Sequence, residues 1–392
     1  MFSINKHSYL HNYHADINPG LINRCVDKAF GFTSLDVHDL EPPFQRLCSE
    51  QPNIPVQNLD VIHRPIGYGR GAMVKLRHDL SDHDDLVVAA SLESITELVI
   101  DSEWAFEAIK LRLIERLVNL LMHDNAVIRE RSAIVLWKIA KLAKAREIIV
   151  ANKALLNNVS FILEDQCEAV RVHAAKMLST VAESWTAADE LIKFGFITIL
   201  LQIIKDKEEK YIILIHLGTL KSLMYSMTGK SVAMEYHGFD VMLDYITDEN
   251  TDVSSEALYC LAQMTTTCLG EKLAREKKLM ATLDSLLHDE RASVHTATAS
   301  VIMFCTVKAA GKMMAAEYPR IVPRLLQLAQ NFQNPSTQMY SIKALTNISE
   351  NPKIRRLLQE KYSQELGRIQ IKQDEDIEMW KTQLMDVVSW VP

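Results

Sequence analysis

Residues 165–178 read DQCEAVRVHAAKML, and this stretch decides the fold. Val170, Ala174 and Leu178 are spaced four residues apart, which places all three on one face of an α-helix. The outer two are apolar and the central one is small, so a neighbouring helix can approach closely at that point. The stretch therefore predicts a short buried helix that follows Asp165 and packs against other helices.

The same pattern returns along most of the chain. An Asp follows an apolar stretch at intervals of 41 or 42 residues, at Asp124, Asp165, Asp206, Asp248 and Asp289. The apolar, small, apolar triplet recurs in phase, at Ile128/Ser132/Leu136, Val253/Ala257/Leu261 and Val294/Thr298/Ile302, with weaker copies at Leu86/Ala90/Ser94, Ile212/His216/Leu220 and Thr337/Ser341/Leu345. We expect each Asp to cap the next helix by accepting from its free N–H groups. We also expect Gly195 and Gly238 to supply the left-handed residue between two helices.

A repeat of this length without β-type alternation is typical of armadillo and HEAT proteins and excludes tetratricopeptide and ankyrin repeats. The runs Ala344–Ser349 and Asn125–Arg129 resemble the third-helix patterns of the armadillo family. That resemblance implies an all-α superhelical solenoid, with two or three short helices in each repeat. Whether a given repeat is of the armadillo or the HEAT type stays open at this point.

Prolines divide the chain into three parts. Six lie between Pro19 and Pro65, and the next is Pro319, which leaves a long stretch suited to consecutive helices. We therefore predict an irregular N-terminal arm over residues 1–65, about seven repeats of about 42 residues over 66–355, and a C-terminal helix within 356–392. That helix has an apolar face formed by Ile377, Trp380, Leu384, Val387 and Val388. It either caps the last repeat or is offered to a partner, with Trp380 and Trp390 as anchors.

Composition limits the classes of function. The net charge of −7 and the pI of about 6.0 argue against nucleic acid as a partner. The six cysteines include no C-x-x-C pair, so we expect reduced thiols in an intracellular compartment. The longest apolar runs are far shorter than the roughly 20 residues that span a bilayer, so we expect no membrane partner.

Motifs that could carry chemistry are weak. Gly229-Lys230-Ser231 resembles the end of a phosphate-binding loop, but the required first glycine is replaced by Met224, and we expect a turn between helices. His7, His11 and His14 have helical spacing without a nearby Cys or carboxylate cluster, so we expect no metal site and no cofactor. No Cys/His or Ser/His/Asp set can be placed, and we predict that the protein is not an enzyme.

The third helix of each repeat should line a concave groove that binds other proteins. The nuclear-import armadillo proteins grip a basic peptide there with a ladder of Trp and Asn, and of these positions here only Asn347 agrees. Lys176 and Lys343 stand at Trp positions and Lys138 at an Asn position of this ladder, which favours an acidic or mixed partner. Our candidate contact residues are Lys138, Lys176, Tyr259, Gln263, Lys343 and Asn347, together with Trp380 and Trp390.

A further resemblance concerns the start of the repeats. The run Ile66–Leu76, followed by Asp84–Leu86 and Glu107–Ile109, is similar to the opening of the armadillo proteins of the ciliary radial spoke head. It implies a non-catalytic scaffold subunit of the axoneme of a cilium or flagellum, in contact with several other spoke subunits. The alternative is a soluble armadillo adaptor or transport receptor that carries a peptide ligand in its groove.

Overall fold

The structure is a computed structural model that describes residues 71–372 and 374–390. Within these ranges it contains 23 helices and no strand. The predicted arm over residues 1–65 and the three spaced histidines lie outside the described residues. The chain forms two compact units, an N-terminal one over Met1–Ala145 and a C-terminal one over Arg146–Pro392. None of the helices described is long and apolar enough to cross a membrane.

The helices follow one another in a repeating order of three kinds. The first helices of the repeats are α7 (Ser102–Lys110), α10 (Ala143–Ala151), α13 (Trp185–Phe194), α16 (Met227–Glu235), α19 (Cys268–Glu276), α22 (Ala309–Ala316) and α25 (Pro352–Lys361). The second helices are α5 (Ala72–Asp79), α8 (Leu113–Leu120), α11 (Lys153–Ile162), α14 (Phe196–Lys205), α17 (Gly238–Tyr245), α20 (Leu279–Leu286), α23 (Ile321–Ala329) and α26 (Ser363–Gly367). The third helices are α6 (Asp85–Leu98), α9 (Ala126–Ile139), α12 (Glu168–Ala182), α15 (Lys210–Leu223), α18 (Thr251–Thr265), α21 (Ala292–Cys305), α24 (Pro335–Ser349) and α27 (Glu375–Ser389).

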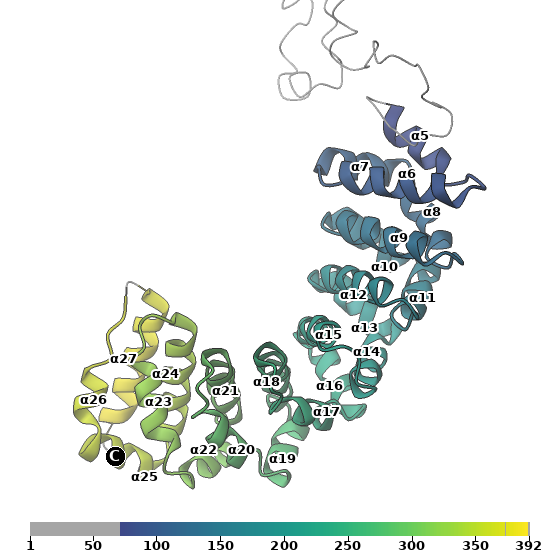
Figure 1. Ribbon diagram of the computed structural model, residues 1–392. Helices are drawn as coiled ribbons and strands as arrows, with labels where there is room; N and C mark the ends of the chain where they lie inside the picture. The colour runs from purple at the N-terminus through teal and green to yellow at the C-terminus, as the bar shows by residue number, and fades with distance from the viewer. Residues whose placement is uncertain (1–70, 373, 391–392) are drawn as a thin grey trace, which may run out of the picture. The chain divides into compact units, whose positions relative to one another are not determined.

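The third helices pack on one another in sequence order. In the N-terminal unit α6 packs on α9, with α5 and α8 against them. In the C-terminal unit α12, α15, α18, α21, α24 and α27 form a continuous succession, which we call the third-helix row. Figure 1 shows α15, α18, α21 and α24 of this row side by side. The C-terminal helix α27 packs on α24 as α24 packs on α21, so it occupies the place of a further third helix.

Six of the seven triplets that define the repeat form the core of the stack, whereas in the weak copy at residues 86–94 Leu86 is 78% exposed and Ala90 and Ser94 are half-buried. Their central residues Ser132, Ala174, His216, Ala257, Thr298 and Ser341 are fully buried. The outer apolar residues, such as Val170 and Leu178, are buried as well, and each fully buried aliphatic side chain contributes about 1.5–3 kcal/mol. The predicted all-α solenoid is therefore confirmed, and each repeat contains three helices rather than two. The division into an arm, seven repeats and a terminal helix stays a prediction.

The aspartates that mark the repeat do not cap helices as predicted. The side-chain oxygen Oδ1 of Asp165, Asp248 and Asp289 accepts from the backbone N–H two residues later, at 2.7–2.8 Å. That N–H belongs to the N-cap residue itself, at Cys167, Asn250 and Arg291. The capping role predicted for these aspartates is wrong, because they stand two residues too early. They fix the turn that leads into the third helix instead.

The left-handed residue between first and second helices varies. Gly195 has φ of +104° between α13 and α14, as predicted. At the equivalent junction between α16 and α17 the left-handed residue is His237, with φ of +60°, and Gly238 is already helical. The prediction for Gly238 was wrong by one position.

Glycine is required where a first helix crosses the end of the preceding third helix. Gly229, Gly270 and Gly311 are the third residues of α16, α19 and α22. A Cβ on them would lie only 2.1, 2.1 and 1.7 Å from a backbone carbonyl oxygen. Lys230 therefore lies within α16 and not in the turn that we predicted, and its Nζ donates to Thr266 at 3.1 Å.

Candidate functional site

The predicted contact residues lie on third helices. Lys138 is on α9, Lys176 on α12, Tyr259 and Gln263 on α18, Lys343 and Asn347 on α24, and Trp380 on α27, whereas Trp390 directly follows α27. All of them are half-buried except Trp390, which is 56% exposed. The structure therefore brings Lys176, Tyr259, Gln263, Lys343, Asn347 and Trp380 onto the third-helix row.

Lysines of this row lie over aromatic rings of the next third helix. The Nζ of Lys176 is 5.5 Å from the ring centroid of Tyr211, that of Lys221 is 5.4 Å from Tyr259, and that of Lys343 is 4.4 Å from Trp380. We call these three pairs the lysine–aromatic rungs. Each such contact at a partly exposed position is worth about 0.5–1 kcal/mol. The rungs hold both the ammonium groups and the rings in fixed positions on the surface of the row.

The rung at Lys221 belongs to a larger polar cluster. Lys221 Nζ also donates to Glu256 at 2.7 Å. Burial, and next the nearby Tyr340, raise the pKa of Tyr259 to about 12. Burial, and next Tyr225, raise the pKa of Tyr340. These phenols therefore stay protonated at neutral pH and can donate hydrogen bonds, and Tyr225 is 70% exposed.

The helix beneath this cluster is covered on all sides. α21 carries small side chains such as Thr296, Ala297 and Ser300, and these are buried. Thr296 shares a hydrogen bond with Thr337 of α24. Tyr259 and Tyr340 lie on α18 and α24, the two third helices that pack on α21, and Tyr340 contributes to the raised pKa of Tyr259.

Two of the predicted contact residues form bonds within the stack. Lys138 Nζ donates to the carbonyl oxygen of Thr96 at 3.1 Å. Asn347 Nδ2 donates to the carbonyl oxygen of Met303 at 3.0 Å. Asn347 thus bonds the neighbouring third helix with the amide group that an armadillo ladder would offer to a peptide. Trp390 lies apart from the rungs, and the guanidinium of Arg355 is 4.7 Å from its ring centroid.

Sequence reasoning missed several members of the surface, namely Tyr211, Lys221, Tyr225, Glu256 and Tyr340. The signal that could have found the rungs is the separation of each lysine from its aromatic partner, which is slightly less than one repeat. An aromatic residue on the next third helix contacts the lysine when it stands about one turn before the position that corresponds to the lysine.

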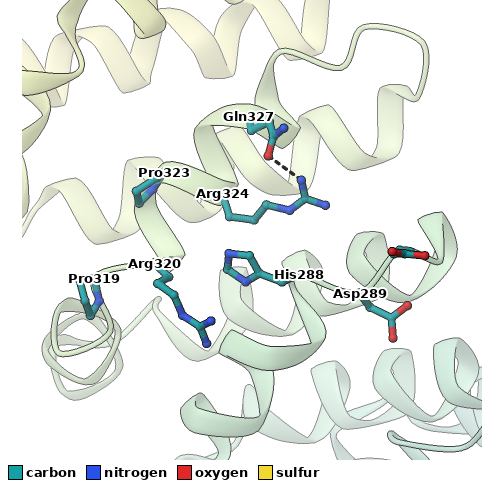
Figure 2. A pocket seen from close by; sticks show the side chains of 8 residues that line it. His288, Asp289, Pro319, Arg320, Pro323, Arg324 and Gln327 are labelled. Atoms are coloured by element: carbon teal, nitrogen blue, oxygen red, sulfur yellow. Dashed lines mark hydrogen bonds between the residues drawn. The ribbon is translucent and has the colours of Figure 1, made fainter.

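A pocket lies on the opposite, second-helix side of the C-terminal unit (Figure 2). It has a volume of about 450 Å³, between the end of α20 and the helix α23. It is lined by His288, Asp289, Glu290, Pro319, Arg320, Pro323, Arg324 and Gln327. A second pocket of about 420 Å³ lies between α14 and α17. It is lined by Thr198, Leu201, Gln202, Lys205, Glu235, Tyr236, His237, Asp240, Val241 and Asp244.

Two of the four described cysteines are buried in the stack, whereas Cys167 is half-buried and Cys268 is exposed. Within residues 71–372 and 374–390 no three His, Cys, Asp or Glu side chains gather as a metal site. Cys260 and Cys305 are buried, and burial raises the pKa of both thiols, for Cys305 to about 12. Both therefore remain protonated and unreactive at neutral pH.

Comparisons with known proteins agree on the fold. An engineered protein of known crystal structure superposes with a TM-score of 0.70 at 15% identity, over 81% of this chain and 78% of that chain. A designed armadillo repeat protein superposes with a TM-score of 0.54 at 14% identity, over 59% of this chain and 99% of that one. A family model described as Cnd1, non-SMC mitotic condensation complex subunit 1, matches residues 236–378. This chain is thus an armadillo/HEAT-like repeat solenoid, and the family match covers less than half of it.

Proposed function

We propose that the chain is a non-catalytic scaffold subunit that binds partner proteins along its third-helix row. The observation that carries the proposal is the set of lysine–aromatic rungs, which place Tyr211, Tyr259 and Trp380 at half-exposed positions between lysines. Rigid aromatic side chains of this kind are the commonest anchors of protein interfaces. The rows of third helices in repeat solenoids form extended binding surfaces of the same type.

The charge of the rungs indicates the chemistry of the partner. A basic peptide would meet Lys176 and Lys343 at positions where the import proteins carry Trp, and Lys221 on the same row, and like charges would repel it. An acidic or mixed segment can place carboxylates on the lysines and apolar side chains on the rings. Glu256 compensates part of the charge at Lys221, which favours a mixed segment over a uniformly acidic one.

For the assembly, we propose the radial spoke of a ciliary or flagellar axoneme. The support is the resemblance of Ile66–Leu76, Asp84–Leu86 and Glu107–Ile109 to the armadillo proteins of the spoke head. Residues 66–70 of that run lie outside the described residues. On this proposal the protein resides in the axoneme and contacts several spoke subunits at once.

A second candidate follows from the family match over residues 236–378. That stretch begins just before α17 and ends within α27, so it includes Tyr259 of the second rung and Lys343 of the third, but not Trp380. Its description names a subunit of a mitotic condensation complex. A scaffold of that class would hold partner proteins on mitotic chromosomes.

The experiment is to tag the protein in a ciliated, dividing cell and to follow it through fractionation. Retention in the axoneme after detergent and salt, and loss together with the radial spokes, is the expected result. Recruitment to mitotic chromosomes would contradict the radial-spoke proposal and support the second candidate. Release with the cytosol would favour a soluble adaptor or transport receptor and contradict both.

A matched pair of variants tests the surface itself. Tyr211 on the third-helix row and Tyr236 on the second-helix side are 53% and 49% exposed. Tyr211→Ser should lower retention in the assembly several-fold, whereas Tyr236→Ser should leave it unchanged. Equal retention of both variants would show that the row is not the binding surface.

A further inference from the structure

The pocket between α20 and α23 presents basic groups that converge on one space. Figure 2 shows the imidazole of His288 between the side chains of Arg320 and Arg324. Arg320 donates from Nε and Nη2 to Asp284 Oδ2, at 3.1 and 2.6 Å. Arg324 donates from Nε to the carbonyl oxygen of Leu287 at 3.0 Å and from Nη1 to Gln327 Oε1 at 2.6 Å. These bonds leave Nη1 of Arg320 and Nη2 of Arg324 available for a ligand.

The histidine between them has a defined orientation. His288 Nδ1 lies 2.8 Å from the carbonyl oxygen of Asp284, which can only accept, so Nδ1 carries a proton. The other ring nitrogen, Nε2, is therefore the one that can meet a ligand. Nε2–H of an imidazolium can donate to a phosphate oxygen, and an unprotonated Nε2 can accept from a P–OH group.

Part of this arrangement is ordinary packing. In the N-terminal unit Arg116 of α8 donates to the carbonyl oxygen of Leu80 at the end of α5, as Arg324 of α23 does to Leu287 at the end of α20. That bond explains why an arginine occupies position 324. It does not explain Arg320 or the histidine beside it, and it holds the Arg324 guanidinium in place for a ligand at small entropic cost.

The equivalent pocket two repeats earlier shows that the fold does not require these groups. Relative to the start of the second helix, His237, Val241 and Asp244 of the α14–α17 pocket stand where Arg320, Arg324 and Gln327 stand here. Asp240 stands in place of Pro323. Lys205 stands in place of His288, so the two pockets share a basic group there and differ at the positions of Arg320 and Arg324.

Two of the three acids around the basic pocket are bonded to arginines, although Asp284 Oδ1 is buried without a hydrogen-bond partner within the described residues. Asp284 is bonded to Arg320, and both carboxylate oxygens of Asp289 are bonded to Arg291. Glu290 also lines the pocket and is exposed. The first turn of α23 contributes the positive end of the helix dipole to the same space.

We propose that this pocket binds a phosphorylated serine or threonine side chain of a partner protein. Three donors from different directions suit the three terminal oxygens of a phosphate monoester better than the planar pair of a carboxylate. Pro319 and Pro323 give the wall an apolar part for residues that flank the phosphate. The proposal rests on the scaffold function above, since the phosphate belongs to a partner that the scaffold holds.

The test is calorimetric titration of the full chain with the N-acetyl N-methylamide of O-phosphoserine. We expect saturable binding to the wild type, and at least tenfold weaker binding to His288→Ala and Arg324→Gln. Arg275→Gln, an exposed arginine of α19 outside the pocket, should bind as the wild type does. Glu290→Gln should bind two- to fivefold more tightly, because it removes a like charge from the lining.

Several results would overturn the proposal. Absence of binding, or equal affinity in the wild type, His288→Ala and Arg324→Gln, excludes the pocket as the site. Inorganic phosphate that binds as tightly as the phosphoserine derivative indicates a free-ion site. Equal affinity for the corresponding glutamate derivative indicates that the pocket binds a carboxylate side chain and not a phosphate. Arg324→Gln also loses the bond to Leu287, so thermal unfolding is measured for each variant to check that it is folded. If Arg324→Gln is unfolded, the affinities of the His288 and Glu290 variants test the proposal. The titration uses purified protein, so its failure is independent of where the protein resides in cells.

Discussion

α15 and α18 occupy the same place in successive repeats, yet they differ at two corresponding positions. The central buried residue is His216 in α15 and Ala257 in α18, and both are fully buried. The position two residues later, on the surface of the third-helix row, is Gly218 in α15 and Tyr259 in α18. The two helices thus share one backbone arrangement but differ in what they bury and in what they present.

The comparison shows which positions need a particular residue for the helices to pack and which positions accept different residues. The close crossings after both helices are alike, since Gly229 follows α15 and Gly270 follows α18 with a carbonyl oxygen in the way of any Cβ. The surface position can change from glycine to tyrosine because side chains there meet no backbone. The buried position tolerates even a histidine, although neither ring nitrogen of His216 has a hydrogen-bond partner within the described residues.

Replacement of the crossing glycine should have the largest effect. In Gly270→Ala the new Cβ would lie 2.1 Å from the carbonyl oxygen of Met264, so α19 must move away from α18. We expect a loss of about 3 kcal/mol or more in the free energy of unfolding, measured by urea denaturation. A loss below about 1 kcal/mol would show that the crossing relaxes easily and that the repeats are not constrained there.

His216 should make the stability of the protein depend on pH, which Ala257 cannot do. Burial lowers the pKa of His216 to about 4, against 6.5 for the exposed side chain, while Glu208 raises it slightly. Between these two pH values His216 is protonated in the unfolded chain and neutral in the folded chain. The contribution of His216 to stability is therefore present above pH 6.5 and is lost as the pH falls toward 4, by about 3 kcal/mol in total.

Comparison of the wild type with His216→Ala isolates this contribution. Carboxylates whose pKa is lowered in the fold, such as Asp248 and Asp289, also lose stabilisation in acid, but they do so in both proteins. Urea denaturation at pH 7 and at pH 4.5 should show a smaller loss for His216→Ala. Parallel losses in the two proteins would mean that His216 is protonated inside the fold and has found a partner.

The repetitive part of the fold was readable from the sequence for a physical reason. Every third helix must approach its neighbours closely, so the triplet with a small centre recurs, and its period alone identifies the solenoid. The finer geometry was less accessible, because an Asp two residues before a helix looks the same as one at the N-cap. The glycines at 229, 270 and 311 recur every 41 residues, and this signal was available but was not used.

The candidate surface was only partly predictable. Tyr259, Lys176 and Lys343 were predicted because they stand at marked positions of the repeat, and Trp380 because it lies on the apolar face of the C-terminal helix. Their partners Tyr211 and Lys221 lie on the adjacent helix and one turn away, and that relation depends on how far neighbouring helices are shifted along their axes. The basic pocket combines His288 after α20 with Arg320 and Arg324 at the start of α23, and a single repeat does not reveal this grouping.

Gly218→Ala should have a modest effect of opposite sign to Gly270→Ala. A Cβ at Gly218 meets nothing within 4 Å, and the residue lies in the interior of α15. Alanine is favoured over glycine inside a helix, so we expect a gain of about 0.5–1 kcal/mol in the free energy of unfolding. Measured beside Gly270→Ala in the same denaturation series, a loss would mean that the surface of α15 is more crowded than that of α18.

The smallest effect concerns the rung between Lys221 and Tyr259, which joins the two helices. A double-mutant cycle with Lys221→Met and Tyr259→Leu should give a coupling energy of about 0.5–1 kcal/mol. The bond from Lys221 to Glu256 is lost in both backgrounds and cancels in the cycle. A coupling near zero would mean that lysine and ring are merely neighbours. The rungs would then contribute nothing to holding adjacent third helices together, and their recurrence on the row would have to be explained by partner binding alone.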